Sequence, residues 1–111
     1  MNLANYIEFG NDGKTLRGNV ATLTLDVDLT GELFTSDNPQ APAYRLWGRS
    51  PRGKKIDVGG IWKKKNHQGG DYYSLTVNLG SLKLYANLGR YPGQDDESLY
   101  AVIFGDYLGK L

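Results

Sequence analysis

The sequence predicts an all-β domain of six to eight antiparallel strands arranged as a meander, which either closes into a small barrel or splits into a sandwich. The first observation is composition: 15 glycines and 8 tyrosines, with frequent Val, Ile and Thr, favour strands joined by tight turns. The second is that apolar residues recur with a period of two, whereas no stretch has convincing helical periodicity. The length of 111 residues is that of a single domain over residues 1–111.

The first half of the chain predicts short strands separated by turns. A strand is expected over Asn5–Phe9 and a turn at Gly10–Gly13, because Gly, Asn and Asp tolerate positive φ. The clearest alternation, over Ala21–Leu29, predicts one strand whose start lies near Leu16. The elements expected after it are a break at Gly31, a brief strand over Glu32–Thr35 and a proline-containing loop over Ser36–Pro42.

The segment Tyr44–Lys65 predicts a β-hairpin around the turn Ser50-Pro51-Arg52-Gly53. Pairing Arg49 with Lys54 would mix apolar and polar residues on both faces. If Gly53 takes a left-handed bulge position, Ser50 faces Lys54 instead, and the two faces separate by polarity. We therefore expect the second register. The expected core face comprises Tyr44, Leu46, Gly48, Ile56, Val58, Gly60 and Trp62, and the expected outer face comprises Arg45, Trp47, Arg49, Lys55 and Asp57.

The second half predicts another hairpin and a last strand. Apolar and polar residues alternate over Tyr73–Leu79, and Gly80-Ser81 then fits a two-residue turn with Gly first. This turn pairs Val77 with Leu84, apolar against apolar. The remaining expected elements are a turn at Asn66–Gly70, an acidic loop over Gly89–Glu97 and a strand over Leu99–Phe104. This strand is apolar on both faces and is therefore expected to be central or covered on both sides.

The strongest functional signal is an uneven distribution of charge. Tyr44–Lys65 contains eight of the 13 Lys and Arg residues, both tryptophans and one acid, Asp57. This segment carries +7 and the whole chain +1, so the remainder carries −6. The asymmetry indicates a class of partner. Because nothing in the sequence points to a reaction, we expect a non-enzymatic protein without catalytic residues, metal ligands or cofactors.

The outer face of the predicted hairpin combines cations with aromatic rings. Single-stranded nucleic acid binds where cations follow the phosphates and aromatic faces stack the bases, at ~1–3 kcal/mol per base. Tyr72 is expected beside Lys63 on this same face. The candidate residues for binding nucleic acid or another partner are Arg45, Trp47, Arg49, Arg52, Lys54, Lys55, Lys63, Lys64, Lys65 and Tyr72.

Two other interpretations of this face remain open. Trp and Arg are enriched in protein interfaces, so the hairpin would also suit a homo-oligomer or another protein partner. Lys and Arg also form solvated surfaces that protect strands from aggregation. Because nucleic acid explains both the charge and the exposed ring with one cause, it is the first hypothesis, and a protein-interaction or assembly module is the alternative.

The other polar groups predict structural roles. Asp26 and Asp28 lie two residues apart on the solvent face of a strand, where carboxylates keep the surface soluble. Asp95–Glu97 lacks the regular spacing of a calcium loop and is expected to be a solvated loop, or to contact the basic hairpin of a second copy. His67, the only histidine, lies in a glycine-rich turn without a partner for catalysis. Gly59-Gly60 fits a strand bulge better than a phosphate loop.

Cysteine content and hydropathy limit the compartment. The chain has no cysteine, which excludes disulfides and thiolate zinc sites and suits a reducing cytoplasm. The start lacks a basic region followed by an apolar run, and no apolar run approaches ~20 residues. We therefore expect a cytoplasmic protein without a signal peptide or a membrane partner.

Three motifs are specific: Ala41-Pro42-Ala43-Tyr44-Arg45, Gly59-Gly60-Ile61-Trp62-Lys63 and Tyr73-Ser74-Leu75. Within a likeness from about Leu16 to Phe104, they resemble a family of small bacterial proteins, the domain of unknown function 736 family. This chain has Asn78-Leu79-Gly80 where the family has Asp-Asp-Pro, so a tight hairpin replaces a longer bend. The resemblance implies accessory bacterial biology, often on mobile elements, and supplies no catalytic residues.

Overall fold

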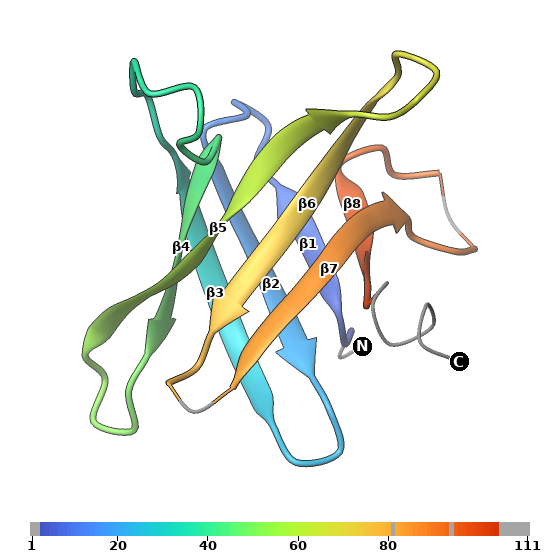
Figure 1. The fold of residues 1–111 in the computed structure, drawn as a ribbon. Coiled ribbons are helices and arrows are strands. Elements are labelled where there is room, and N and C mark those ends of the chain that lie inside the picture. Colours follow the sequence, from blue (N-terminus) through green and yellow to red (C-terminus); the bar gives the residue numbers. More distant parts are fainter. Residues whose placement is uncertain (1–2, 81, 94, 105–111) are drawn as a thin grey trace.

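The strands form a closed, up-and-down antiparallel barrel in a computed structural model that describes residues 3–80, 82–93 and 95–104 (Figure 1). Each strand pairs with its neighbours in sequence, and the last strand pairs with the first, Tyr6 opposite Ala101. Among the described residues there is no helix that could cross a membrane. The strands are β1 (Tyr6–Phe9), β2 (Thr15–Ala21), β3 (Asp26–Leu33), β4 (Tyr44–Arg49), β5 (Lys55–Lys65), β6 (Asp71–Asn78), β7 (Lys83–Arg90) and β8 (Leu99–Ile103).

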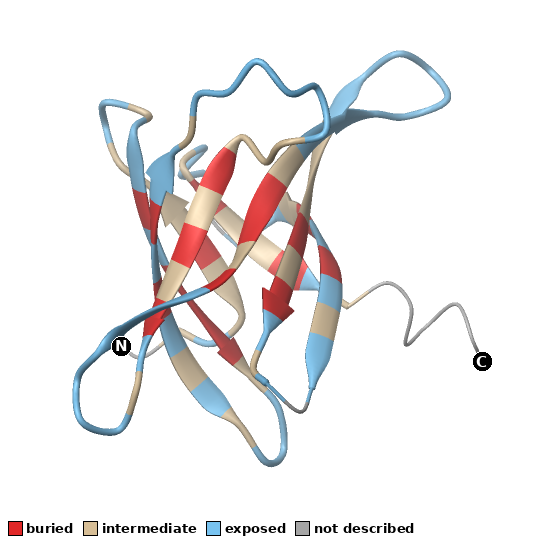
Figure 2. Cartoon of the chain, turned by 60° about the vertical axis from the view of Figure 1, so that its left-hand side comes forward, coloured by how far each residue is buried: buried red, intermediate tan, exposed pale blue. Residues whose placement is uncertain are grey.

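Side chains fill the inside of the barrel. Strand alternation turns every second residue inward, and Figure 2 shows the buried positions recurring along the strands. Four aromatic rings pack together in this core: Phe9 lies 5.1 Å from Tyr44, 5.5 Å from Tyr73 and 5.4 Å from Tyr100, between ring centroids. The largest fully buried side chains are Ile7, Val20, Leu29, Leu46, Ile61, Leu75 and Val77.

The expected single strand over Ala21–Leu29 is wrong, because the chain turns within it. Thr22 accepts hydrogen bonds at its Oγ1 from the backbone N–H groups of Thr24 (3.2 Å) and Leu25 (3.1 Å). This local side-chain bond replaces the glycine or proline that usually marks a turn. Leu23 is consequently fully exposed at the tip. Apolar and polar residues still alternate before and after the turn, because β2 and β3 pair Val20 with Val27.

Gly31 does not break the pattern as expected. It is buried inside β3, where a Cβ would lie 2.7 Å from Leu16 Cγ, so the missing side chain admits the leucine of β2. Glu32 belongs to the end of the same strand rather than to a separate one. The loop over Ser36–Pro42 is confirmed, and so is the first strand, which covers Tyr6–Phe9.

The register predicted at the hairpin turn is confirmed. Gly53 has φ of +85°, and the backbone N–H of Ser50 donates to the carbonyl of Lys54 at 2.8 Å. Further along, Leu46 pairs with Gly59 and Trp47 with Asp57, which leaves Val58 without a partner residue. This extra residue is the β-bulge that the paired glycines predicted, and Gly59 has φ of +149°.

The prediction that Trp62 belongs to the core is wrong, and the bulge is the reason. Past the extra residue the inward and outward positions of β5 exchange, so Ile61 pairs with Tyr44 and is fully buried. Trp62 is half-buried on the outer face, where its Nε1–H donates to the carbonyl of Gln40 at 2.9 Å. Ile56 also leaves the expected core, at 46% exposed, because its part of the hairpin extends beyond the packed interior.

The second half follows the predicted pairing. Val77 pairs with Leu84, and Gly80 has φ of +95° at the turn, whose other residue, Ser81, lies outside the described residues. β7 continues to Arg90, so the acidic loop begins later than expected. The last strand ends at Ile103 and pairs with β7 on one side and β1 on the other, so the prediction of a central strand is confirmed, although Ile103 is 43% exposed on its outer face.

Candidate nucleic-acid interface

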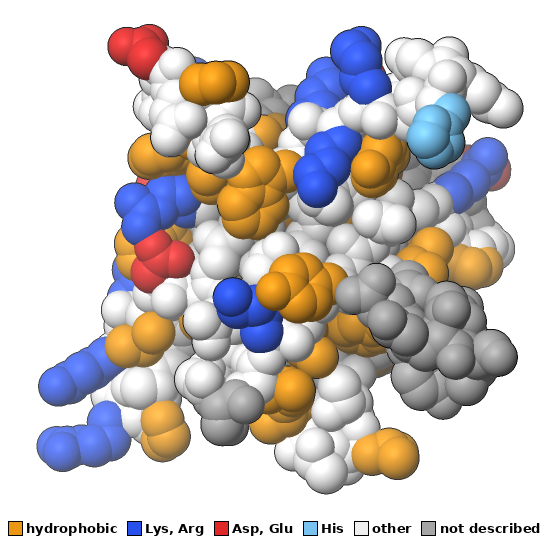
Figure 3. Space-filling model, viewed as in Figure 1, with side chains coloured by type: hydrophobic (Ala, Val, Ile, Leu, Met, Phe, Trp, Pro, Cys, Tyr) orange, Lys and Arg blue, Asp and Glu red, His pale blue; other side chains and the backbone are white. Residues whose placement is uncertain are grey.

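The β4–β5 hairpin projects from the barrel as a basic arm (Figures 1 and 2). We call residues Arg49–Ile56 the basic tip. It contains four cations, no acid and only one residue that is not exposed, Ser50. Figure 3 shows Lys and Arg side chains gathered at the lower left, where this hairpin lies. The tip thus carries exposed positive charge away from the packed core (Figure 1).

Hydrogen bonds within the basic tip hold its loop in shape. The Ser50 Oγ accepts from the backbone N–H of Lys54 at 3.0 Å, and Arg49 Nη1 donates to the carbonyl of Gly53 at 3.1 Å. Arg52 and Lys54 are exposed. Within the described part of the chain, none of the ion pairs involves Arg49, Arg52 or Lys54. These three cations are therefore available to an external anion.

Trp47 lies on the outer face, as predicted, between Thr30 of β3 and Asp57 of β5. It is half-buried, and its Nε1 atom is covered without a hydrogen-bond acceptor among the described residues. Lys55 Nζ lies 4.4 Å from the ring centroid and the Arg45 guanidinium carbon 5.2 Å from it. These cation–π contacts are each worth ~0.5–1 kcal/mol at an exposed site. A base that stacked on Trp47 would have to displace them.

Arg45 and Lys55 are also engaged by acids. Arg45 forms an ion pair with Asp57, and Lys55 pairs with Glu32 at 3.1 Å. Arg45 further lies over the ring of Phe34, at 5.4 Å. Glu32 and Phe34 come from the end of β3 and the residue after it, and no pattern within Tyr44–Lys65 could reveal them. Exposed pairs of this kind contribute ~0–1 kcal/mol, but they lower the local positive potential.

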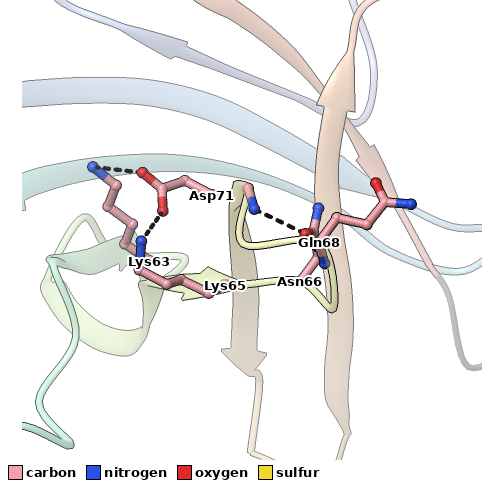
Figure 4. A network of polar contacts seen from close by, with 6 residues as sticks. Lys63, Lys65, Asn66, Gln68 and Asp71 are labelled. Atoms are coloured by element: carbon pink, nitrogen blue, oxygen red, sulfur yellow. Dashed lines mark hydrogen bonds and ion pairs between the residues drawn. The ribbon is translucent and has the colours of Figure 1, made fainter.

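The lysines at the other end of β5 are divided between two faces. Lys63 and Lys65 both contact Asp71 on β6, with Nζ–Oδ distances of 3.5 and 3.2 Å (Figure 4). Lys64 pairs with Tyr72 on the opposite face. The prediction that Tyr72 lies beside Lys63 is therefore wrong, because the bulge also shifts these positions. The adjoining turn is held by Asn66, whose Oδ1 accepts from two backbone N–H groups at 2.9 Å each.

The hydrogen bond from Lys65, the positive charge of Lys65 and then that of Lys63 hold the pKa of the Asp71 carboxyl below its usual value. A depressed pKa stabilises the fold above the unfolded-state value, and this stabilisation is lost as pH falls through the folded-state pKa. We expect Lys65→Met to raise the titration midpoint of Asp71 more than Lys63→Met does, in side-chain carboxyl NMR. Lys64→Met is the matched control and should leave the midpoint unchanged; an equal shift in all three variants would contradict the contact.

The candidate binding residues were predicted to form one surface, but in the structure they lie in separate places. Ten residue steps along β5 separate Lys55 from Lys65, up to about 33 Å at ~3.3 Å per residue. Arg49, Arg52 and Lys54 stand together in the basic tip. Lys55, the fourth cation of the tip, contacts Trp47 on the barrel wall, where Arg45 also lies over the ring. Lys63, Lys64, Lys65 and Tyr72 lie at the far end of β5.

The acids of β3 have a structural role that the sequence did not show. Asp26 and Asp28 are exposed, as expected, and each accepts from Asn19 Nδ2 through Oδ1, at 2.7 and 3.2 Å. Asn19 is only 5% exposed, and its Oδ1 accepts from the backbone N–H of Asn5 at 3.2 Å. The described residues contain no cluster of three or more His, Cys, Asp or Glu side chains that could hold a metal. His67 lies in the exposed turn after β5.

Comparison with known proteins identifies a family. Curated proteins and solved structures yield no match to this chain. The family described as "Protein of unknown function (DUF736)" matches residues 7–105, which extends the resemblance toward the start of the chain and includes β1 from its second residue. The match covers most of the 111 residues and nearly the whole barrel. The chain therefore belongs to the DUF736 family.

Proposed function

We propose that this protein binds nucleic acid, without catalysing a reaction, through the basic β-hairpin of residues 44–65. The observation that carries the proposal is the projecting basic tip, with four cations and no acid over Arg49–Ile56. Arg49, Arg52 and Lys54 lack ion-pair partners among the described residues. Phosphate groups bound by such cations release condensed counterions, which favours binding to nucleic acid of any sequence.

The proposal predicts a steep dependence of binding on salt. If about three cations contact phosphates, raising salt from ~50 to ~200 mM weakens binding about 40-fold for a B-form duplex and about 20-fold for a single strand. Fluorescence anisotropy of labelled oligonucleotides measures the dissociation constants at the two salt concentrations. In Arg49→Gln/Lys54→Gln, the slope of log K against log salt should fall by about 2, because two phosphate contacts are lost.

The matched control is Lys14→Gln/Lys83→Gln, which removes the same charge from exposed positions outside the hairpin. We expect this control to keep nearly the salt slope of the unaltered protein. No detectable binding at low salt would refute the proposal. Equal losses in both double variants would show that net charge rather than the hairpin governs binding.

Self-association is the second candidate function. It is favoured by the exposed acidic residues Asp95, Asp96 and Glu97, on a loop at the right of Figure 1, across the molecule from the basic hairpin. Head-to-tail contact between the two would neutralise both surfaces. Light scattering at low and high salt tests this candidate. A mass that stays monomeric at every concentration and salt level would exclude it.

A further inference from the structure

We propose that the nucleic acid is B-form duplex DNA and that the β4–β5 hairpin binds in its major groove. This inference rests on the proposed function and adds the form of the ligand. It follows from the state of Trp47, from the dimensions of the projecting hairpin and from the side chains at its tip.

The contacts of Trp47 argue against a single-stranded ligand. Binding of single strands relies on aromatic faces that are free to stack bases. Here Lys55 Nζ and the Arg45 guanidinium lie over the ring, and both cations are also held by acids, Glu32 and Asp57. Trp62 is turned to the outer face, but its N–H is bonded to the Gln40 carbonyl at the other end of the barrel wall from the basic tip. The basic tip itself contains no aromatic residue.

The dimensions of the hairpin match the major groove. Two paired strands lie ~4.8 Å apart, and a ribbon of this width with its side chains fits a groove ~12 Å wide but not the minor groove, ~6 Å wide. From the pair Gly48–Ile56 to the tip, three residue steps give a projection of about 10 Å, comparable with the groove depth of ~8.5 Å. The arm can therefore reach the base edges before the barrel meets the backbone.

The side chains of the tip suit this position. Arg52 is at the end of the arm and is exposed, so it is the residue that would reach the floor of the groove. Arginine donates two parallel hydrogen bonds to guanine O6 and N7, whereas lysine cannot reproduce this fork. Within the tip, Arg49 is the last residue of β4 and Lys54 directly precedes β5, where they would meet the phosphates that line the groove.

The experiment compares one guanine-containing sequence as a DNA duplex, an RNA duplex and single-stranded DNA, by fluorescence anisotropy at low salt. The two duplexes carry similar phosphate charge, but the major groove of A-form RNA is deep and too narrow for side chains. We expect the DNA duplex to bind about tenfold more tightly than the RNA duplex, the factor that one bidentate arginine–guanine contact contributes. Arg52→Lys keeps the charge and the salt slope but should abolish this preference.

Each alternative outcome has a distinct meaning. Equal affinity for both duplexes, or displacement of the protein from DNA by the minor-groove ligand netropsin, overturns the major-groove inference and leaves the proposed function standing. Tighter binding of the single strand, with quenched Trp47 emission in a Trp62→Phe background, overturns it in favour of base stacking. Absence of binding to all three oligonucleotides overturns the proposed function as well.

Discussion

Gly59→Ala is expected to destabilise the protein by about 2–6 kcal/mol, enough to unfold a domain of ordinary stability of ~5–15 kcal/mol at its lower end. Two costs combine. A residue with a side chain rarely adopts φ of +149°, and the new Cβ would overlap the carbonyl oxygen of Thr76 and lie 2.9 Å from its carbonyl carbon. The obstacle is backbone of the neighbouring strand β6, which cannot move aside without breaking the β5–β6 ladder.

Urea denaturation followed by tyrosine and tryptophan emission measures the loss. The matched control is Gly53→Ala, because Gly53 also has positive φ, +85°, but no atom lies within 4 Å of its Cβ position. This variant has only the conformational cost, about 1–2 kcal/mol. If both variants lost the same stability, the close approach of β5 to β6 at the bulge would not exist.

Ile61→Ala is expected to cost about 2–5 kcal/mol, the range for truncating a fully buried aliphatic side chain. Ile61 is completely buried opposite Tyr44, so its removal leaves a cavity in the packed barrel interior. Trp62→Ala should cost only about 1–2 kcal/mol, although it deletes a larger side chain. Trp62 is half-buried on the outer face and loses mainly one hydrogen bond and part of its contact area.

Which of these two substitutions destabilises the protein more tests directly which residues of β5 face the core. Without the bulge, Trp62 would point into the core and its truncation would cost about 3–5 kcal/mol, while Ile61→Ala would be mild. Urea midpoints at equal m-values give the comparison. A larger loss for Trp62→Ala than for Ile61→Ala would contradict the register. Ile61→Val, expected at about 0.5–1.5 kcal/mol, keeps the measurement possible if Ile61→Ala does not fold.

Part of the candidate site was predictable because it depends on local chemistry. Gly53 at a three-residue loop determines which residues of β4 and β5 face each other near the turn, so Trp47 and Arg49 were placed on the outer face correctly. The acid-free tip is visible in the composition alone. What could not be predicted were the partners from other strands. Glu32 and Asp71 neutralise part of the charge, and both lie outside the segment.

The sequence by itself determined the all-β class, most of the turns, the presence of a bulge at Gly59-Gly60 and the concentration of charge in one segment. These properties depend on the conformational preferences of Gly, on period-two alternation and on residue counts, all of which are local. Only the tertiary structure decided that the sheet closes, that Thr22 turns the chain, and that Trp62 exchanges places with Ile61. The physical reason is that one unpaired residue, Val58, reverses the phase of every later position in β5, and that closure selects which distant side chains meet across the strands.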